Sequence, residues 1–330
     1  MAQVFLHVGL NKTGTSSLQD FMAMNAALLL EREGVLYPSA GRVGAAHHGV
    51  TERLKGKAPA GQPDVLQALA EEIRHADKVV ITSESLHGIG PKPLALLAET
   101  LKGHEVQVVF YLREHVAYLA SWYQQNVQAS QSSMGFETFC HYNHKPLHKV
   151  VQPWAQQFGA GQVTVRLYDR EVLAGGDIVQ DFAQVLGLKI PLAECRRKGW
   201  ESNPSVSGNL LFIKRLLNNF YRREQAAKVV DELTELSKLK PSFRGRMQVP
   251  AHVVANLVKG YAQDRQVLAS QWGVQIAPLS SALEGHLTPD LSTLKQDWEM
   301  VMDAAAAKGM VLARAAQALR LGDDLSVFND

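Results

Sequence analysis

The residue types best suited to chemistry lie near the amino terminus, where a short apolar run gives way to glycine, lysine and hydroxyl side chains. Gly9 and Gly14 allow a tight turn and a close approach of the backbone to a ligand. Thr15 and Ser16 follow at the start of a helical pattern, beside amides that have no partner within the helix. With the ammonium group of Lys12 inside it, this loop is suited to bind a phosphate group.

The spacing of the two glycines matches a Walker A loop, G-x-x-x-x-G-K-[ST], but the position of the lysine does not. Thr15 occupies the place after the second glycine, and Lys12 lies two positions before that glycine. We therefore expect the ammonium group to approach a phosphate chain from a different direction than in an ATPase.

A second group of anion-binding residues follows another apolar run. Residues 106–112 have the pattern of a buried strand that ends at Arg113, and residues 116–128 have the pattern of a helix that carries Ser121. A guanidinium group at the end of a strand and a hydroxyl about two turns along the next helix can converge on one anion. The chain therefore has features of two phosphate sites.

A carboxylate follows a third predicted strand. Residues 78–84 read as a strand that ends in polar side chains, the last of which is Glu84. In open α/β sheets the ligand site lies outside the carboxyl ends of the strands, where residues 9–17, Glu84 and Arg113 would all fall. Glu84 is therefore the candidate general base. The alternative bases are three histidines: His47, His48 and His87.

The order of these features resembles the sulfotransferases that use 3′-phosphoadenosine 5′-phosphosulfate (PAPS). Residues 12–16 are similar to their 5′-phosphosulfate loop, Arg113 and Ser121 are similar to their 3′-phosphate segment, and residues 197–199 resemble a further 3′-phosphate element. The resemblance covers about residues 3–190. It implies that PAPS is bound by Lys12, Thr13, Gly14, Thr15, Ser16, Arg113, Ser121, Arg197, Lys198 and Gly199.

The chain departs from the cytosolic members of that family at two positions. Those members have a catalytic histidine where the order of elements places Glu84, whereas several Golgi-type and tyrosyl-protein members have a glutamate there. Ser17 occupies the place of a tryptophan that packs on adenine in cytosolic members, so Trp122, Tyr123 or an apolar residue is left to make that contact.

The resemblance implies in-line transfer of a sulfuryl group to an acceptor hydroxyl, with Glu84 as the base and no metal required. Lys12 and the loop amides would stabilise the charge that develops on the leaving phosphate. The expected acceptor is a carbohydrate or glycolipid. The alternatives are a P-loop kinase or NTPase, and a non-catalytic nucleotide-binding protein on the same fold.

Composition narrows the functional classes. The chain has 330 residues, of which 46% are hydrophobic, and a formal net charge of +2, which does not indicate nucleic-acid binding. It shows neither a secretory leader nor a run of 18 apolar residues, so we expect a cytoplasmic protein without a membrane span. Basic residues expected on the solvated side of one amphipathic helix could contact an anionic saccharide or a membrane surface: Lys214, Arg215, Arg222 and Arg223.

The alternation of strands and helices predicts an α/β fold, with a P-loop-type parallel β-sheet flanked by helices and a mostly helical carboxyl-terminal extension. Residues 1–190 would form the PAPS-binding core, and residues 191–330 an extension on the acceptor and 3′-phosphate side. Residues 39–63 are expected to form a long loop. No metal site is predicted, because Pro146 interrupts the helix on which Cys140 and its neighbouring histidines would have to converge. Further helices are expected over residues 250–269 and 291–320.

Overall fold

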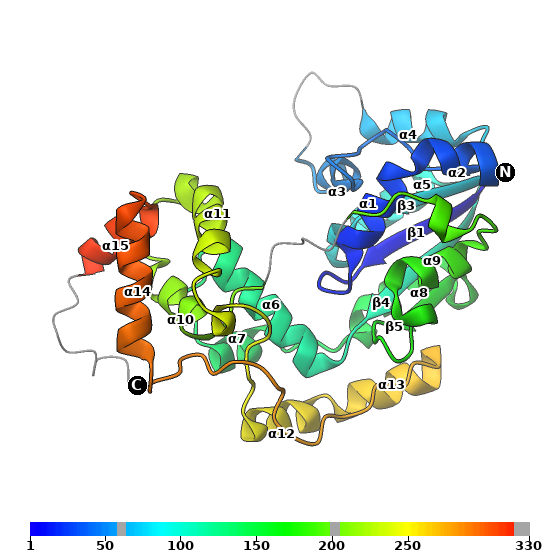
Figure 1. The fold of residues 1–330 in the computed structure, drawn as a ribbon. Helices are drawn as coiled ribbons and strands as arrows, with labels where there is room; N and C mark the ends of the chain where they lie inside the picture. The colour runs from blue at the N-terminus through cyan, green and yellow to red at the C-terminus, as the bar shows by residue number, and fades with distance from the viewer. Residues whose placement is uncertain (58–63, 199–204, 320–330) are drawn as a thin grey trace. The chain divides into compact units, whose positions relative to one another are not determined.

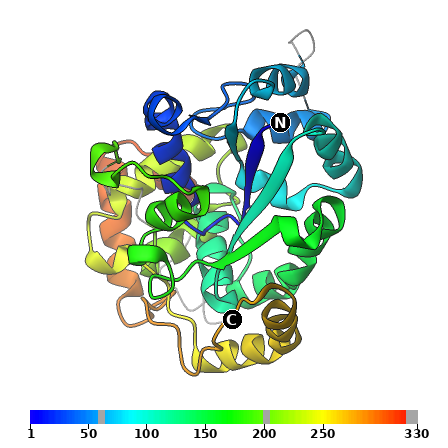
Figure 2. The same ribbon diagram turned by 90° about the vertical axis from the view of Figure 1, so that its right-hand side faces the viewer.

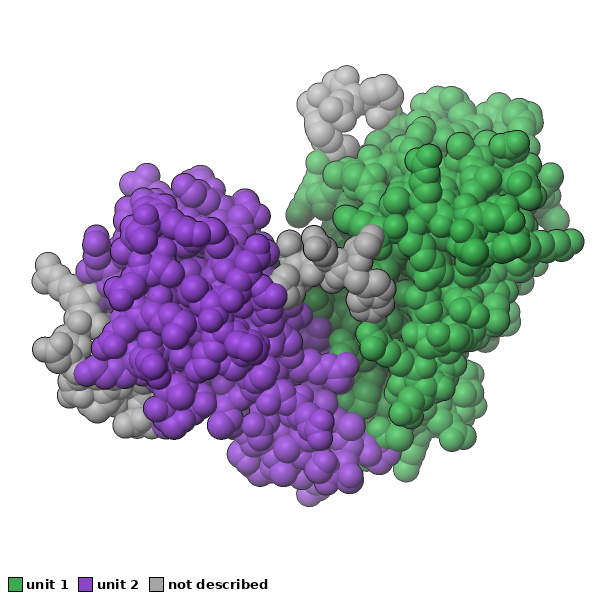
Figure 3. Space-filling view, viewed as in Figure 1, with its two compact units in different colours: residues 1–114, 145–200, 261–277 green, residues 115–144, 201–260, 278–330 purple. Residues whose placement is uncertain are grey.

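The computed structural model describes residues 1–57, 64–198 and 205–319. The chain forms two compact units, each discontinuous in sequence (Figure 3). Unit 1 consists of residues 1–114, 145–200 and 261–277, and unit 2 of residues 115–144, 201–260 and 278–330. The sequence suggested one boundary near residue 190. In the structure the chain instead enters unit 2 directly after its fourth strand and returns to unit 1 two helices later.

Unit 1 is built on a five-stranded parallel sheet with the strand order β2-β3-β1-β4-β5 (Figure 1). The strands β1 and β4 lie side by side and consist largely of buried apolar residues, as expected for strands that are covered on both faces. The strands are β1 (Gln3–Gly9), β2 (Val35–Leu36), β3 (Lys78–Thr82), β4 (Glu105–Leu112) and β5 (Val163–Leu167).

Helices cover both faces of this sheet (Figure 2). On one face, α1, α2 and α9 contribute side chains to a core that includes Phe5 and Val109. On the other face, Trp154 of α8 meets Phe110 of β4, with ring centroids 6.1 Å apart. Side chains alternate along β4, so Val109 and Phe110 point to opposite layers. The main helices of unit 1 are α1 (Thr15–Met24), α2 (Ala26–Glu33), α3 (His48–Leu54), α4 (Val65–Ile73), η1 (Glu84–Gly88), α5 (Pro91–Thr100), α8 (His148–Phe158), α9 (Ile178–Leu186) and α13 (Ala262–Trp272).

Unit 2 is helical. The chain enters it through the long helix α6, and the remaining helices pack in part against α6 and α10. None of the helices in the described ranges is long and apolar enough to cross a membrane. The main helices of unit 2 are α6 (His115–Ala129), α7 (Phe136–Asn143), α10 (Gly208–Leu217), α11 (Ala226–Leu236), α12 (Ala251–Gly260), α14 (Leu294–Ala307) and α15 (Val311–Leu319).

The predicted fold class is confirmed: a parallel sheet flanked by helices, with a mostly helical carboxyl-terminal region. Three details differ. Residues 39–63, expected to be a loop, contain the helix α3. Residues 250–269 and 291–320 each contain two helices, because the chain turns at Tyr261 and at Gly309, whose φ is 58°.

Lys214 does not lie on a solvated helix face, so that prediction is wrong. The residue is 1% exposed, because α6 and α14 pack against α10. Its ammonium group donates to the carbonyl oxygen of Val127 at 3.1 Å and also to the side chains of Asn218 and Tyr221. Burial lowers the pKa of Lys214 to about 7.

Candidate functional site

The loop between β1 and α1 has the backbone conformation that its glycines predicted. Gly9 and Gly14 have φ values of 119° and 75°, and Lys12 has a φ of 64°. A Cβ atom on Gly14 would lie 2.8 Å from Cε2 of Tyr168, and one on Gly9 would lie 3.3 Å from the backbone oxygen of Glu84. Both positions therefore require glycine for positive φ and for close packing.

The hydroxyl groups of the loop have different surroundings. Thr13 is fully buried, and its Oγ1 donates to the carbonyl oxygen of Leu10 at 2.6 Å, which holds the loop in shape. Thr15 is buried at the first position of α1, and Ser16 is exposed. The first amides of this ten-residue helix have no acceptor within the helix, so they and Ser16 are the donors that an anion could reach.

Two cationic side chains meet at this loop. Arg113 follows the end of β4, and its Nη1 donates to the carbonyl oxygen of Lys12 at 3.2 Å. The guanidinium group also lies over the ring of Tyr168, 5.9 Å from its centroid. Burial, together with the charge of Arg113, lowers the pKa of Lys12. Since no carboxylate pairs with Lys12 in the described ranges, an anionic ligand would relieve this concentration of positive charge.

Glu84 lies at the start of η1, directly beyond β3. Its Oε2 accepts a 2.6 Å hydrogen bond from Nε2 of Gln19 in α1, and its Oε1 lies 3.8 Å from Nε2 of His48. The side chain is 24% exposed, so a ligand can reach part of it. Because Gly9 packs against the backbone of Glu84, the carboxylate and the loop are adjacent.

The three histidines proposed as alternative bases differ in their freedom to accept a proton. His47 is fully buried: its Nε2 donates to the carbonyl oxygen of Pro38, its Nδ1 accepts from the amide of Thr82, and burial lowers its pKa to about 4. His87 donates from Nδ1 to the carbonyl oxygen of Glu84, and its pKa is also lowered by burial. His48 is the one whose ring faces the carboxylate of Glu84.

Two residues of the predicted 197–199 element lie along α1 and the start of α9. Nη1 of Arg197 donates to Asp177 at 3.0 Å, and Nζ of Lys198 donates to Asp20 at 3.3 Å. Asp177 also caps α9, the helix whose Ile178 lies against Gly14. Gly199 falls outside the described residues.

Ser121 lies on α6 in unit 2 and is half-buried. The structure describes that unit by itself, so the role of Ser121 in 3′-phosphate binding stays a prediction.

Two contacts of the site were not found from the sequence. Tyr168 directly follows β5, so the rule that placed Glu84 and Arg113 at the carboxyl edge of the sheet could also have placed Tyr168 there. Gln19 lies four residues after Thr15 on α1, and this spacing brings both side chains to the same face of the helix.

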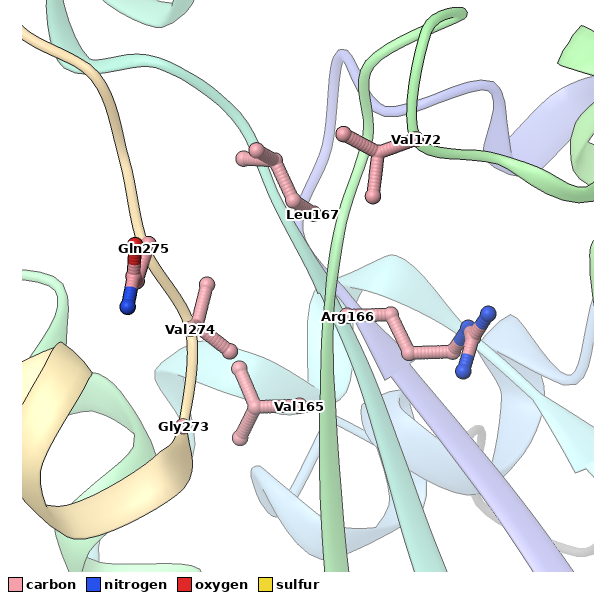
Figure 4. A pocket seen from close by; sticks show the side chains of 7 residues that line it. All are labelled: Val165, Arg166, Leu167, Val172, Gly273, Val274 and Gln275. Carbon is pink, nitrogen blue, oxygen red and sulfur yellow. The ribbon is translucent and has the colours of Figure 1, made fainter.

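Unit 1 also contains a cavity of about 420 Å³ beside β5 and the segment after α13 (Figure 4). In the close-up view, Val165 and Val274 point toward one another, whereas Arg166 points to the other side of the strand. Arg166 forms a bidentate ion pair with Asp181 on that side. None of the loop residues lines this cavity.

Unit 2 has a cavity of about 530 Å³ next to α7 and α12. It is lined by Glu137, Cys140, His141, His144, Val253, Asn256 and Leu257. Across the residues that the structure describes, no three histidine, cysteine, aspartate or glutamate side chains are grouped to hold a metal ion.

Comparisons with known proteins yield few matches. No family model matches the sequence. An uncharacterised protein of Archaeoglobus fulgidus is 27% identical over 171 residues, which are 50% of this chain and 45% of that protein. The matched region thus spans about half the length of this curated relative. The crystal structure of a sulfotransferase from Alicyclobacillus acidocaldarius superimposes with a TM-score of 0.43 at 16% identity, covering 82% of this chain and 95% of that one.

Proposed function

We propose that this chain is a sulfotransferase that moves the sulfuryl group of PAPS to an acceptor hydroxyl. One observation carries the proposal: Arg113, at the end of β4, donates a hydrogen bond to the carbonyl oxygen of Lys12, and the loop that contains Lys12 packs through Gly9 against the backbone of Glu84. The two cations suit a donor with several anionic groups, and the carboxylate suits an acceptor that must lose a proton.

In the proposed reaction, the acceptor oxygen attacks sulfur while the bond from sulfur to the bridging oxygen of the phosphosulfate breaks. The electron pair of that bond passes to the leaving 3′-phosphoadenosine 5′-phosphate (PAP), and the proton of the hydroxyl passes to Glu84. Lys12 and the free amides of α1 stabilise the charge on the leaving phosphate. A sulfuryl group carries less charge than a phosphoryl group, so the proposal needs no metal ion.

The proposed donor has a second phosphate, on the 3′ position of its ribose. Arg113 is the residue of unit 1 assigned to it, because a guanidinium group offers a fork of donors. Arg197 and Lys198 are ion-paired beside α1, and binding to the nucleotide would require them to exchange a carboxylate for phosphate. The assignments of Ser121 and Gly199 rest on the sequence resemblance.

For the acceptor we propose a carbohydrate or glycolipid hydroxyl. Polar side chains from two elements surround the reactive carboxylate: Gln19 from α1 and His48 from α3. Such groups can hydrogen-bond the hydroxyls that neighbour the attacking one on a sugar. The proposed location is the cytoplasm, with peripheral contact to a membrane in the case of a glycolipid.

Nucleotide preference tests the donor assignment. Thermal unfolding is measured with PAP, AMP and ATP for the wild type, for Lys12→Ala, and for Lys102→Ala, a control that removes an exposed lysine of unit 1. We expect PAP to raise the unfolding temperature more than AMP or ATP, and Lys12→Ala alone to reduce this effect. Magnesium-dependent stabilisation by ATP that exceeds the effect of PAP would instead support a P-loop kinase or NTPase.

A further inference from the structure

A row of polar side chains runs from the candidate base into the protein. Nε2 of His48 lies 3.8 Å from Oε1 of Glu84, and Nδ1 of the same ring lies 3.0 Å from Oγ of Ser83. Oγ of Ser83 in turn lies 3.0 Å from Oγ1 of Thr51. Ser83 and Thr51 are fully buried, whereas His48 is 34% exposed. The row therefore joins a buried hydroxyl pair to a carboxylate that a ligand can reach.

We propose that Glu84 and His48 act as one proton-accepting pair, in which Glu84 takes the proton of the acceptor hydroxyl and passes it to Nε2 of His48. His48 then holds this proton until the product leaves, and releases it to water. The inference rests on the proposed function, because it assigns a second acid-base residue to the same transfer.

The direction of the proton transfer follows from ordinary proton affinities. A free imidazole has a pKa of about 6.5 and a free glutamic acid one of about 4.3, so a proton shared by the two residue types favours the imidazole. The carboxylate that remains is negative and lies next to the imidazolium that forms, which adds a favourable interaction. Transfer to His48 therefore restores Glu84 as a base.

The contacts of His48 suit both of its charge states. An imidazolium donates from both ring nitrogens, and here each nitrogen faces an acceptor: Oε1 of Glu84 and Oγ of Ser83. The hydroxyl groups of Ser83 and Thr51 can each donate or accept, so the pair can reverse its hydrogen bonds when the ring is neutral. The separation of 3.8 Å exceeds a hydrogen bond and has to shorten in the complex, as is common for catalytic contacts.

The other half of the carboxylate is held in place. Oε2 of Glu84 accepts from Gln19 at 2.6 Å, which leaves Oε1 to face both the acceptor and His48. Gln19 is therefore a positioning residue: it sets the orientation of the carboxylate and exchanges no proton.

The elements around His48 carry few groups that titrate near neutral pH. On α3 itself, Arg53 pairs with Asp64, and Glu52 and Lys55 are exposed. The packed element η1 contributes His87, whose pKa is lowered by burial and by the charges of Lys145 and Lys55. The helices α4 and α5 also pack against α3. Their charged groups are Glu71, Glu72, Lys92 and Glu99.

The test is a pH titration of the histidine rings in the full-length chain with labelled histidine. Nuclear magnetic resonance monitors the titration. Spectra are recorded with and without PAP for the wild type, Glu84→Gln and Ser83→Ala, and the exposed ring of His75 is the internal reference. We expect the titration midpoint of His48 to be lower in Glu84→Gln than in the wild type, because the substitution removes a negative charge beside the ring, while that of His75 does not move. An unchanged midpoint of His48 would overturn the pairing.

Kinetics separate proton transfer from a structural role. We expect His48→Gln to lower kcat about tenfold without changing the KM for PAPS. We also expect this variant to lose one ionisation from the pH profile of kcat, whereas His87→Gln retains it. A His48→Gln enzyme that keeps this ionisation and its full kcat contradicts the inference. The proposed function fails separately, if the wild type neither binds PAP nor consumes PAPS. The titration without nucleotide tests the pair in that case too.

Discussion

The guanidinium group of Arg113 donates a 3.2 Å hydrogen bond to the carbonyl oxygen of Lys12, which ties the end of β4 to the loop that follows β1. The two strands are neighbours in the sheet, so residues about a hundred positions apart in the chain form one cationic surface. We expect PAP binding to need both the positive charge of Arg113 and the planar shape of its guanidinium group.

Replacement of Arg113 separates charge from shape. Arg113→Lys keeps a cation but loses the planar fork of donors, and Arg113→Ala loses both. We expect the affinity for PAP to fall about tenfold in the lysine variant and about a hundredfold in the alanine variant, since charge-assisted hydrogen bonds contribute about 1.5–3 kcal/mol each. Calorimetric titration with PAP and AMP measures this. If both variants keep the wild-type preference for PAP, Arg113 does not contact the 3′-phosphate.

Gly14→Ala tests the close packing of the loop. A Cβ atom there meets the ring of Tyr168 at 2.8 Å and also forces a side chain into a φ of 75°. Gly34→Ala is the matched control, because its φ is 64° but no atom lies within 4 Å of the added Cβ. We expect the control to lose about 1 kcal/mol of unfolding free energy, and Gly14→Ala to lose more, together with PAP binding. Equal losses measured by urea unfolding would show that Tyr168 does not restrict the loop.

Acid stability depends on two buried histidines of unit 1. Burial lowers the pKa of His7 to about 3, and neither of its ring nitrogens has a hydrogen-bond partner within the described residues. Burial also lowers the pKa of His47 to about 4. The unfolded chain binds protons at these rings below about pH 6.5, whereas the folded chain excludes them. The stability contributed by these neutral rings is therefore fully present above about pH 6.5. It is lost as the pH falls from there toward the pKa values of the two rings in the folded state.

A substitution of His7 checks this pH dependence. His7→Phe keeps a ring near Tyr111 and Phe182, whose ring centroids lie 5.9 and 5.8 Å from that of His7, but it cannot bind a proton. We expect the variant to keep about 2 kcal/mol more of its neutral-pH stability at pH 5 than the wild type keeps. Urea unfolding at pH 5 and pH 7.5 measures the difference. Parallel pH profiles for the two proteins would contradict the account.

Asp181 joins three elements of unit 1: β4, β5 and α9. It is fully buried, accepts hydrogen bonds from Tyr111 of β4 and Arg166 of β5, and lies on α9. Burial alone would raise the pKa of Asp181, but the hydrogen bonds from Arg166 and Tyr111 outweigh it and hold the pKa below its usual range. We expect Asp181→Ala to cost about 3 kcal/mol of unfolding free energy, because the partners lose their acceptor. Asp77→Ala, on the exposed surface of unit 1, is the control and should lose less than about 0.5 kcal/mol.

The sequence predicted those parts of the site that depend on local pattern. Apolar runs marked β1, β3 and β4, and polar residues at the ends of these strands predicted which edge of the sheet carries the loop, Glu84 and Arg113. The contacts between these residues were not predictable in the same way. The hydrogen bond from Gln19 to Glu84 depends on how α1 packs on the sheet, and no periodicity encodes that.

Burial of polar residues was the least predictable property. Lys214 follows a helical spacing that places it opposite an apolar stripe, which is typical of a solvated face. Helices from distant parts of the chain cover that face, and carbonyl and side-chain oxygens replace water around its ammonium group. The same holds for His47. The loop expected over residues 39–63 contains it, but in the structure it forms the amino-terminal boundary of α3 and hydrogen-bonds to two backbone groups.

Formation of PAP from PAPS tests the central claim most directly. The measurement compares the wild type with Glu84→Gln in the presence of a mixture of oligosaccharides and glycolipids, with sulfur-35 in the sulfuryl group of the donor. We expect labelled acceptor and PAP to form in equal amounts with the wild type. We also expect Glu84→Gln to bind PAP as tightly as the wild type but to transfer the sulfuryl group at least a hundredfold more slowly, since a general base contributes roughly 10²–10⁴-fold. Transfer at the wild-type rate by Glu84→Gln, or no formation of PAP by the wild type, would contradict the central claim.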